Sequence, residues 1–225
     1  FVLSSNPEII FHLAAQPLVR ESYLEPIKTI ETNINGTLNL LEVAKHCKNL
    51  KTIIIVTSDK CYENNNSGKS FRESDRVGGL DPYSFSKASV ELLVTSYRKS
   101  FFNYANSPYI ASARAGNVIG GGDWSKDRLI PDIIDSILSN KDLKIRYPKA
   151  TRPWQHVLDC TFGYLKLGQK AMERVPISNS AFNFGPSKNN NISVIDVLKK
   201  SKKYFNDMKF SIVSEKKFYE ANLLF

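Results

Sequence analysis

The sequence predicts an α/β protein, a doubly wound parallel sheet with a smaller, mixed α/β lobe. Two observations carry this prediction. The run Thr52–Val56 is β-branched at every position and apolar on both faces, as in strands of a parallel sheet that helices cover on both sides. Strands and helices also alternate along the first half of the chain, which is typical of doubly wound sheets.

The first half supplies the alternating elements in order. The apolar run Glu8–Leu13 predicts a buried strand, and apolar residues at a three-to-four spacing predict an amphipathic helix over Pro26–Lys48. The strand Thr52–Val56 follows, and after a polar loop Asp81 and Pro82 predict the start of a helix that runs to about Phe102. Tyr109–Arg114 predicts the next strand.

The pattern changes after Gly116, where a run of three glycines, Gly120–Gly122, interrupts it. We expect residues 1–118 to form one domain and residues 119–225 mostly a smaller lobe that crosses back to the sheet in places. The elements expected in this second part are helices at Pro131–Leu138, Val157–Met172 and Ser193–Tyr204 and strands at Leu143–Ile145 and Ala181–Phe184.

Composition excludes several classes of protein. Hydrophobic residues make up 42% of the 225 residues and charged residues 24%, so disorder is not the main state. No apolar run approaches the roughly 20 residues that a membrane-spanning helix needs. The three cysteines form no metal-binding pair and fit a reducing, cytoplasmic compartment, and the three histidines suggest no metal site. The net charge of +9 is interpreted as a solvated, lysine-rich surface and not as a nucleic-acid interface.

Tyr83 and Lys87 are the first candidates for chemistry. Their spacing of four puts them on one face of the predicted helix, where a lysine ammonium favours the phenolate form of the tyrosine. Such a tyrosine becomes a usable base near neutral pH. The alternative is a solvent-facing pair, since one Tyr-x-x-x-Lys is expected by chance in a chain of this composition.

Polar residues end the clearest strand. Thr57, Ser58, Asp59 and Lys60 follow Val56 directly, and the carboxyl ends of parallel strands face the ligand crevice of an α/β sheet. A hydroxyl, an acid and an amine delivered together there could polarise, protonate and deprotonate a substrate. The alternative is a polar exit loop in which Ser58 and Asp59 bond to nearby backbone.

Taken together, these motifs resemble those of the extended, sugar-nucleotide-modifying branch of the short-chain dehydrogenase/reductase superfamily. The similarity extends from about Pro7 to about Phe205. It is most specific in four strings, which are Ala14–Arg20, Thr57–Tyr62, Ser112–Trp124 and Arg152–Val157. Within the superfamily these strings are similar to those of the sugar-nucleotide 4,6-dehydratases.

The resemblance implies an intramolecular redox dehydration with NAD as cofactor and a nucleotide-activated glucose as substrate, CDP-glucose being favoured. The product would be CDP-4-dehydro-6-deoxy-glucose, a precursor for deoxysugars such as those of lipopolysaccharide O-antigens. Tyr83 would take the C4 hydroxyl proton and Ser58 would hydrogen-bond the C4 oxygen. Lys60 would be the base at C5, Asp59 the acid for the C6 hydroxyl, and Lys87 would also hold the nicotinamide ribose.

The same resemblance implies that residues 1–118 form part of an NAD-binding, Rossmann-type domain with the catalytic residues, and that residues 119–225 mostly bind the sugar nucleotide. It also implies two sets of binding residues. Those implied for the cofactor are Leu13, Ala14, Ala15, Asn33, Thr57, Tyr83 and Lys87. Those implied for the substrate are Gln16, Arg114, Asn117, Arg128 and Arg152, with arginines forming charge-assisted bonds to the diphosphate. Members of this branch are usually dimers, so we expect a homodimer that pairs through the helices Pro26–Lys48 and Pro82–Phe102.

One motif of a dinucleotide fold is missing from the 225 residues. They contain no G-x-G-x-x-G turn, which cradles the pyrophosphate after the first strand. We expect the chain to be a fragment, with the strand that ends at Leu13 as the fourth of the sheet and on the order of 70 residues upstream. Two alternatives to the dehydratase therefore stay open: another epimerase or reductase of the superfamily, and a non-catalytic nucleotide-binding relic.

Overall fold

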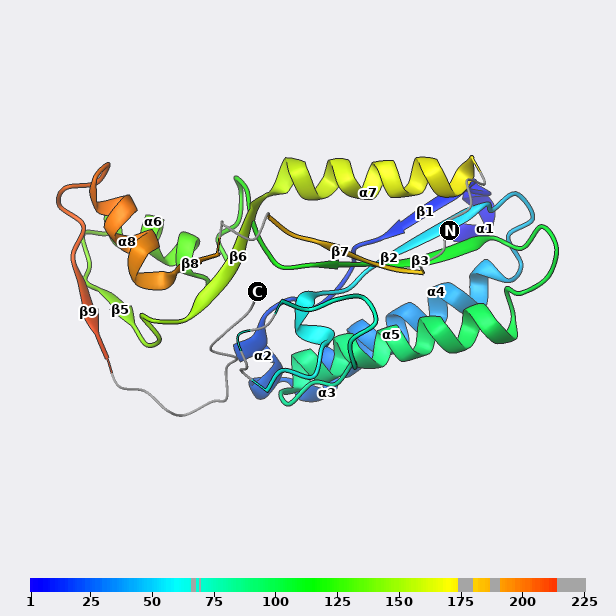
Figure 1. Cartoon of the computed structure of the whole chain (residues 1–225), viewed down its shortest axis with the longest axis horizontal. Coiled ribbons are helices and arrows are strands. Elements are labelled where there is room, and N and C mark those ends of the chain that lie inside the picture. Colours follow the sequence, from blue (N-terminus) through cyan, green and yellow to red (C-terminus); the bar gives the residue numbers. More distant parts are fainter. Residues whose placement is uncertain (66–67, 69, 174–179, 187–190, 214–225) are drawn as a thin grey trace. The chain divides into compact units, whose positions relative to one another are not determined.

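A computed structural model describes residues 1–65, 68, 70–173, 180–186 and 191–213 (Figure 1). The chain divides into two compact units. The first unit comprises Phe1–Asn64, Phe71–Ala115 and Leu158–Phe184, and the second is built mainly from Gly116–Val157 and the described residues after Gly185. The chain therefore leaves the first unit after Ala115 and returns to it at Leu158.

A four-stranded parallel sheet forms the centre of the first unit, which confirms the predicted α/β class. Its order is β1-β2-β3-β7, and every neighbouring pair is parallel. The strands are β1 (Ile9–His12), β2 (Thr52–Val56), β3 (Tyr109–Ala115) and β7 (Ala181–Phe184). The sequence analysis grouped β7 with the later lobe, but its pairing with β3 makes it the fourth strand of this sheet.

Two helical segments cover one face of the sheet (Figure 1). The segment predicted as one helix over Pro26–Lys48 is α3 (Pro26–Ile30), a π-helical turn η1 (Glu31–Asn35) and α4 (Gly36–Ala44). The second segment is α5 (Pro82–Ser100), which begins as predicted: Asp81 caps it by accepting the backbone N–H of Ser84 at 2.9 Å. Two short helices that the sequence did not predict, α1 (Val2–Ser5) and α2 (Val19–Leu24), complete this part of the unit.

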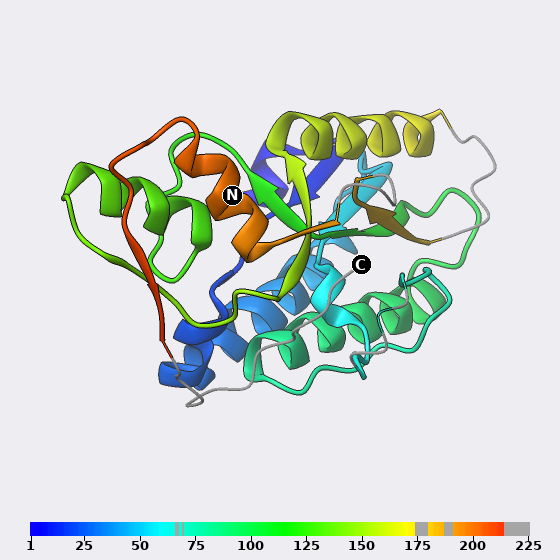
Figure 2. The same cartoon turned by 60° about the vertical axis from the view of Figure 1, so that its left-hand side comes forward.

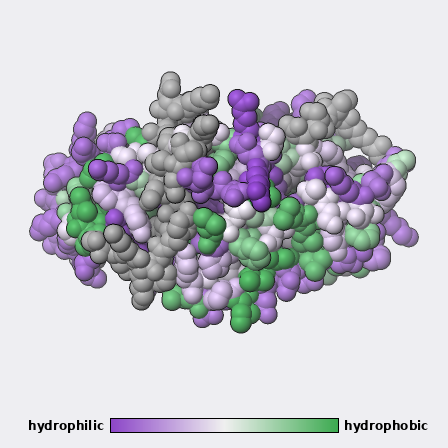
Figure 3. Space-filling model, turned by 60° about the horizontal axis from the view of Figure 1, so that its bottom comes forward, coloured by the Kyte–Doolittle hydropathy of each residue, from purple (hydrophilic) through white to green (hydrophobic). Residues whose placement is uncertain are grey.

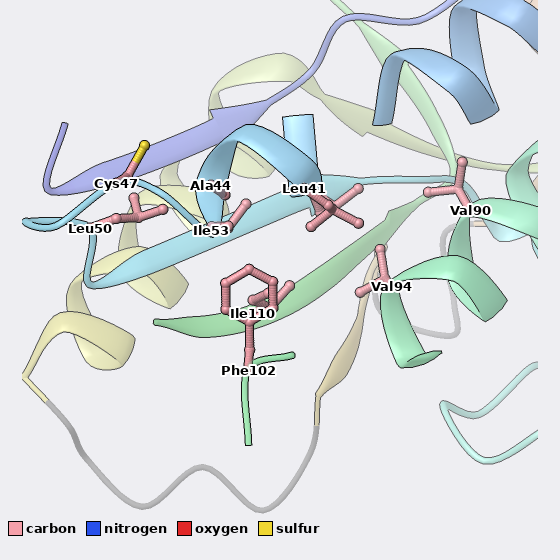
Figure 4. Close-up of a cluster of buried hydrophobic side chains, with 10 residues drawn as sticks. Leu41, Ala44, Cys47, Leu50, Ile53, Val90, Val94, Phe102 and Ile110 are labelled. Atoms are coloured by element: carbon pink, nitrogen blue, oxygen red, sulfur yellow. The ribbon is translucent and has the colours of Figure 1, made fainter. Parts of the chain in front are cut away.

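The main hydrophobic core lies between these helices and the sheet (Figure 4). Leu41 from α4, Ile53 from β2, Val90 and Val94 from α5 and Ile110 from β3 are all buried in it. Burial of one such side chain contributes roughly 1.5–3 kcal/mol, so this cluster fixes α5 against the sheet. The position of the residues on α5 follows from that packing.

Helix α7 (Val157–Met172) covers the opposite face of the sheet (Figure 1). Gly168 lets it approach closely, because a β-carbon at this position would stand 2.7 Å from the ring of Phe11 and 2.8 Å from Ile9. The sheet is therefore sandwiched between α7 and the α4–α5 pair, as expected for a doubly wound fold.

Figure 2 shows the helices and strands of the second unit, which has its own small core. It contains helices α6 (Leu129–Leu138) and α8 (Val194–Lys202), a sheet of β4 (Asn117–Ile119), β6 (Thr151–His156) and β8 (Asn191–Ser193), and a parallel pair of β5 (Leu143–Ile145) and β9 (Phe210–Ile212). Ile133, Leu143, Ile145, Leu198 and Met208 are buried together between the helices and the β5–β9 pair. In the part of the chain that the structure describes, no helix combines the length and the apolar character needed to cross a bilayer.

Candidate active site

The residues that follow β2 form a tight turn around one hydroxyl. Ser58 precedes η2, a single 3₁₀ turn over Asp59–Cys61, and caps it. Its Oγ donates to Oδ1 of Asp59 at 2.9 Å and accepts the backbone N–H of Lys60 at 3.2 Å. The hydroxyl, the acid and the amine predicted from the sequence are thus held in one turn at the carboxyl end of a central strand.

Tyr83 and Lys87 lie in the first two turns of α5, which packs against η2. Tyr83 is 7% exposed and Lys87 is 5% exposed, so the alternative of a solvent-facing pair is wrong. The ammonium of Lys87 donates to the backbone carbonyl of Val56, the last residue of β2, at 3.3 Å. That hydrogen bond joins the two candidate motifs, which are 31 residues apart in the sequence.

The pKa of Lys87 is shifted by its buried surroundings. Desolvation lowers the pKa of this lysine to about 8, although the negative charge of Glu91 and the nearby thiol of Cys61 act in the opposite direction. Burial also lowers the pKa of His12 on β1, and the positive charge of Lys87 lowers it further. A lysine with a pKa lowered in this way gains and loses its proton close to neutral pH. Its ammonium form favours ionisation of a neighbouring phenol.

Arg114 has protein partners in place of the ligand that the resemblance implies. It is 6% exposed, and its Nη2 lies 2.7 Å from Oε2 of Glu91, which is 4% exposed. Its Nη1 donates to the hydroxyl of Tyr62 at 2.8 Å and to the carbonyl of Glu73 at 3.1 Å. The guanidinium is therefore buried inside the first unit and bonded to protein groups there. This partner set does not fit contact with a substrate diphosphate.

Gln16 and Asn33 are also buried among protein groups. Oδ1 of Asn33 accepts the backbone N–H of Gln16 at 2.8 Å, and its Nδ2 donates to the hydroxyl of Ser86 at 2.8 Å. The Gln16 amide donates to Thr29 Oγ1 at 2.8 Å, and Ser86 donates to the carbonyl of Tyr83 at 2.7 Å. These bonds tie the loop after β1 to the helix that carries Tyr83, which is a positioning arrangement and leaves little of either amide for a ligand.

The other residues implied for the cofactor lie at the ends of β1 and β2. Leu13, Ala14 and Ala15 follow β1 directly, and the side chain of Leu13 is 52% exposed. Thr57 follows β2, and its Oγ1 donates to Glu91 at 2.5 Å. Because β1 and β2 are neighbours in a parallel sheet, these residues meet at one edge, where ligands of doubly wound folds bind.

The remaining substrate candidates belong to the second unit. Asn117 begins β4 and pairs with Trp154, and Arg152 lies on β6 beside it in that sheet. Arg128 precedes α6, and its Nη1 donates to Asp123 at 2.9 Å.

Glu91 is the residue of this region that the sequence analysis did not single out. It is buried and accepts hydrogen bonds from Thr57, Ser112 and Arg114. A signal for it was present, because Tyr83, Lys87 and Glu91 recur at intervals of four and share one helix face.

Two relatives show which enzymes the chain is similar to. It is 50% identical over 185 residues to CDP-glucose 4,6-dehydratase of Salmonella typhimurium, an overlap that covers 80% of this chain and 52% of that protein. It is 38% identical over 163 residues to dTDP-D-glucose 4,6-dehydratase of Dictyostelium discoideum, covering 68% of this chain and 36% of that protein. The chain thus spans about half the length, or less, of these curated relatives.

Solved structures share the fold. An epimerase of Methanothermobacter thermautotrophicus superposes with a TM-score of 0.85 at 23% identity, covering 99% of this chain and 64% of that one. TunA, an NAD-dependent NDP-hexosamine 5,6-dehydratase, superposes with a TM-score of 0.81 at 18% identity, covering 96% and 66%. The sequence signature of the GDP-mannose 4,6-dehydratase family matches residues 1–220. The chain therefore belongs to the GDP-mannose 4,6-dehydratase family.

Proposed function

We propose that this chain carries the catalytic residues of an NAD-dependent 4,6-dehydratase of a nucleotide-activated glucose, with CDP-glucose as the favoured substrate. The observation that carries the proposal is the hydrogen bond between Lys87 and the end of β2. It brings the Tyr-x-x-x-Lys helix onto the turn Ser58-Asp59-Lys60, the set of groups that an oxidation followed by elimination requires. The 50% identity to a CDP-glucose 4,6-dehydratase supports the choice of sugar nucleotide.

The residues at the ends of β1 and β2 suit the nicotinamide end of NAD. The Lys87 ammonium has three donors, and its bond to the Val56 carbonyl uses one of them, so it can also donate to ribose hydroxyls. The exposed positions Leu13 and Ala14 offer apolar surface and backbone to a flat ring. When bound, NAD⁺ supplies a hydride acceptor for C4 and, once reduced, a hydride donor for C6.

The chain's own side chains then handle the protons. The phenolate of Tyr83, favoured by the Lys87 ammonium, takes the proton of the C4 hydroxyl while Ser58 hydrogen-bonds the C4 oxygen. The resulting 4-ketone acidifies the C5 proton, which Lys60 removes. Asp59 gives a proton to the C6 hydroxyl, which leaves as water. Lys60 returns its proton to C5 as C6 is reduced, and the proton taken up by Tyr83 balances the one that Asp59 has given up. Before the substrate binds, Ser58 donates to Asp59 and keeps that carboxyl in place.

For the substrate diphosphate we propose Asn117, Arg128 and Arg152 of the second unit. Arg114 is left out of this set because its guanidinium is buried against Glu91. For Gln16 and Asn33 we propose a positioning role, since their amides hold the loop after β1 against the helix of Tyr83.

The partner we propose is a second copy of the chain, docked on α3 and α5. Large apolar side chains are exposed on these helices at Ile27, Phe85 and Leu92, and the last two are seven residues apart on one face. Figure 3 shows the side of the molecule on which these helices lie, with hydrophobic surface on it. A Leu92→Glu variant should be monomeric in sedimentation if this face is the dimer interface, and an unchanged oligomeric state would exclude it.

We also propose a cytoplasmic location. Cys47, Cys61 and Cys160 are all free and buried, which is stable in a reducing compartment.

The test uses the complete product of the gene together with CDP-glucose and NAD⁺. A 4-keto sugar gives an alkali-induced ultraviolet absorbance, and we expect that signal in the wild type and its loss in Tyr83→Phe. A C4-inverted product that keeps its C6 oxygen would establish an epimerase instead, and no turnover of any nucleotide sugar would favour a non-catalytic protein. The 225-residue chain alone should bind NAD⁺ weakly, because its sequence has no Gly-rich turn.

A further inference from the structure

The carboxylate of Glu91 accepts hydrogen bonds from three side chains that lie at or near the ends of two strands. Its Oε1 accepts from Thr57 Oγ1 at 2.5 Å, just after β2. Its Oε2 accepts from Ser112 Oγ at 2.7 Å and from Arg114 Nη2 at 2.7 Å, both on β3. A side chain of α5 is thus tied to both central strands close to their carboxyl ends, where the candidate active site lies.

These bonds are specific enough to set the position of the helix. Apolar packing such as that of Val90 and Val94 holds α5 against the sheet, but packing alone is non-directional. Charge-assisted hydrogen bonds are directional and shorter than neutral ones, and a buried carboxylate with all its partners present permits little sliding of the helix.

We propose that Glu91 is a positioning residue, which fixes α5 against β2 and β3 and thereby places Tyr83 and Lys87 at the turn Ser58-Asp59-Lys60. The inference rests on the proposed function, since it concerns the same site. Glu91 lies one helical turn beyond Lys87, and Lys87 one turn beyond Tyr83. A shift of the Glu91 anchor would therefore carry both catalytic side chains with it.

The charge of Glu91 gives the proposal a readout that a purely structural residue would lack. Three elements carry ionisable groups that interact electrostatically with Lys87. These groups are His12 on β1, Cys61 on η2 and Glu91 on α5 itself. Glu91 is the acid of this set, and its charge stabilises the ammonium form against desolvation. Removal of that charge must therefore be visible in the titration of Lys87.

The experiment is an NMR titration of the 225-residue chain labelled with ¹³C at lysine Cε, whose chemical shift reports protonation of Nζ. Lys87→Arg identifies the Lys87 signal. In Glu91→Gln we expect the pKa of Lys87 to fall by about one pH unit, as for loss of a neighbouring opposite charge. The matched control is Glu42→Gln. Glu42 lies on α4 and accepts from Lys45 and from Tyr97, which is near the C-terminal end of α5, and in this variant Lys87 should titrate as in the wild type.

An unchanged Lys87 titration in folded Glu91→Gln overturns the proposal. If that variant does not fold, Glu91→Gln combined with Arg114→Met removes both charges of the buried pair, an exchange that proteins often tolerate. Compared with Arg114→Met alone, the double variant should show the same fall in the pKa of Lys87, and its absence is equally decisive.

Activity then separates this inference from the proposed function. In the complete protein we expect Glu91→Gln to lower kcat about 10- to 100-fold, as for a small misplacement of catalytic groups, with KM for the sugar nucleotide little changed. A raised KM with unchanged kcat would place Glu91 in substrate binding and refute positioning. An inactive wild type refutes the dehydratase but leaves the Lys87 titration as an independent result.

Discussion

Replacement of Arg114 by methionine should destabilise the first unit strongly, because it leaves the Glu91 carboxylate buried without its counter-charge. The two side chains lie 2.7 Å apart and are 6% and 4% exposed. Loss of one partner of such a pair costs about 3–5 kcal/mol, whereas exchange of both for neutral side chains is often close to neutral. The loss of the hydrogen bonds to Tyr62 and Glu73 acts in the same direction.

Urea unfolding of the 225-residue chain, followed by far-ultraviolet circular dichroism, measures this effect. We expect Arg114→Met to lose about 4 kcal/mol of unfolding free energy, a large part of the 5–15 kcal/mol typical of a domain. Arg114→Met with Glu91→Gln should regain at least half of that loss. A single variant that loses less than about 1 kcal/mol would refute the structural ion pair and return Arg114 to the solvent-facing, diphosphate-binding role.

Three further predictions concern the same unit. The pKa of Lys87 in the folded chain, about 8, lies below the 10.5 of an exposed lysine. At Lys87 the unfolded chain therefore binds more protons between these values, so this residue should add ~3 kcal/mol to the unfolding free energy across about pH 8 to 10.5. The difference in unfolding free energy between the wild type and Lys87→Met, from urea titrations at several pH values, should rise by that amount. Gly79→Ala should lower the unfolding free energy by about 2–3 kcal/mol in the same assay, because the new β-carbon would stand 2.1 Å from the Ser84 backbone, whereas Gly121→Ala meets nothing within 4 Å and should be neutral. Asp81→Ala should cost about 1–2 kcal/mol in thermal or urea unfolding through loss of the α5 cap.

The parts of the fold that the sequence predicted are those that local pattern determines. Strand β2 has the predicted bounds, because five consecutive β-branched residues admit few other structures. Helix α5 begins where its cap and proline predicted. The strands β4, β6, β8 and β9 were not predicted, because their formation depends on partners elsewhere in the chain.

The candidate site was predictable in part for a similar reason. The sequence indicated the polar turn after β2 and the pair Tyr83–Lys87, since both follow from element ends and helical spacing. It could not separate ligand-facing side chains from buried ones. Arg114, Gln16 and Asn33 carry groups that would suit a phosphate or a ribose, but each is hydrogen-bonded to protein atoms in other elements, up to 53 residues away in the sequence.

One face of α5 explains how the site combines reactivity with rigidity. Three residues at intervals of four lie on this face. Tyr83 lies at the start of the helix, Lys87 donates a hydrogen bond to the end of β2, and Glu91 accepts hydrogen bonds from β3 and from the residue that follows β2. A reactive tyrosine needs a neighbouring cation, and a buried lysine remains cationic near neutral pH only if an anion stands close to it. That anion is itself tolerable in the interior only because Arg114 and two hydroxyls satisfy it. The chemistry proposed for Tyr83 thus depends on the charges of Lys87, Glu91 and Arg114, the last two of which are paired in the interior. Variants of Glu91 and Arg114 should therefore affect the pH dependence of the reaction as strongly as its rate.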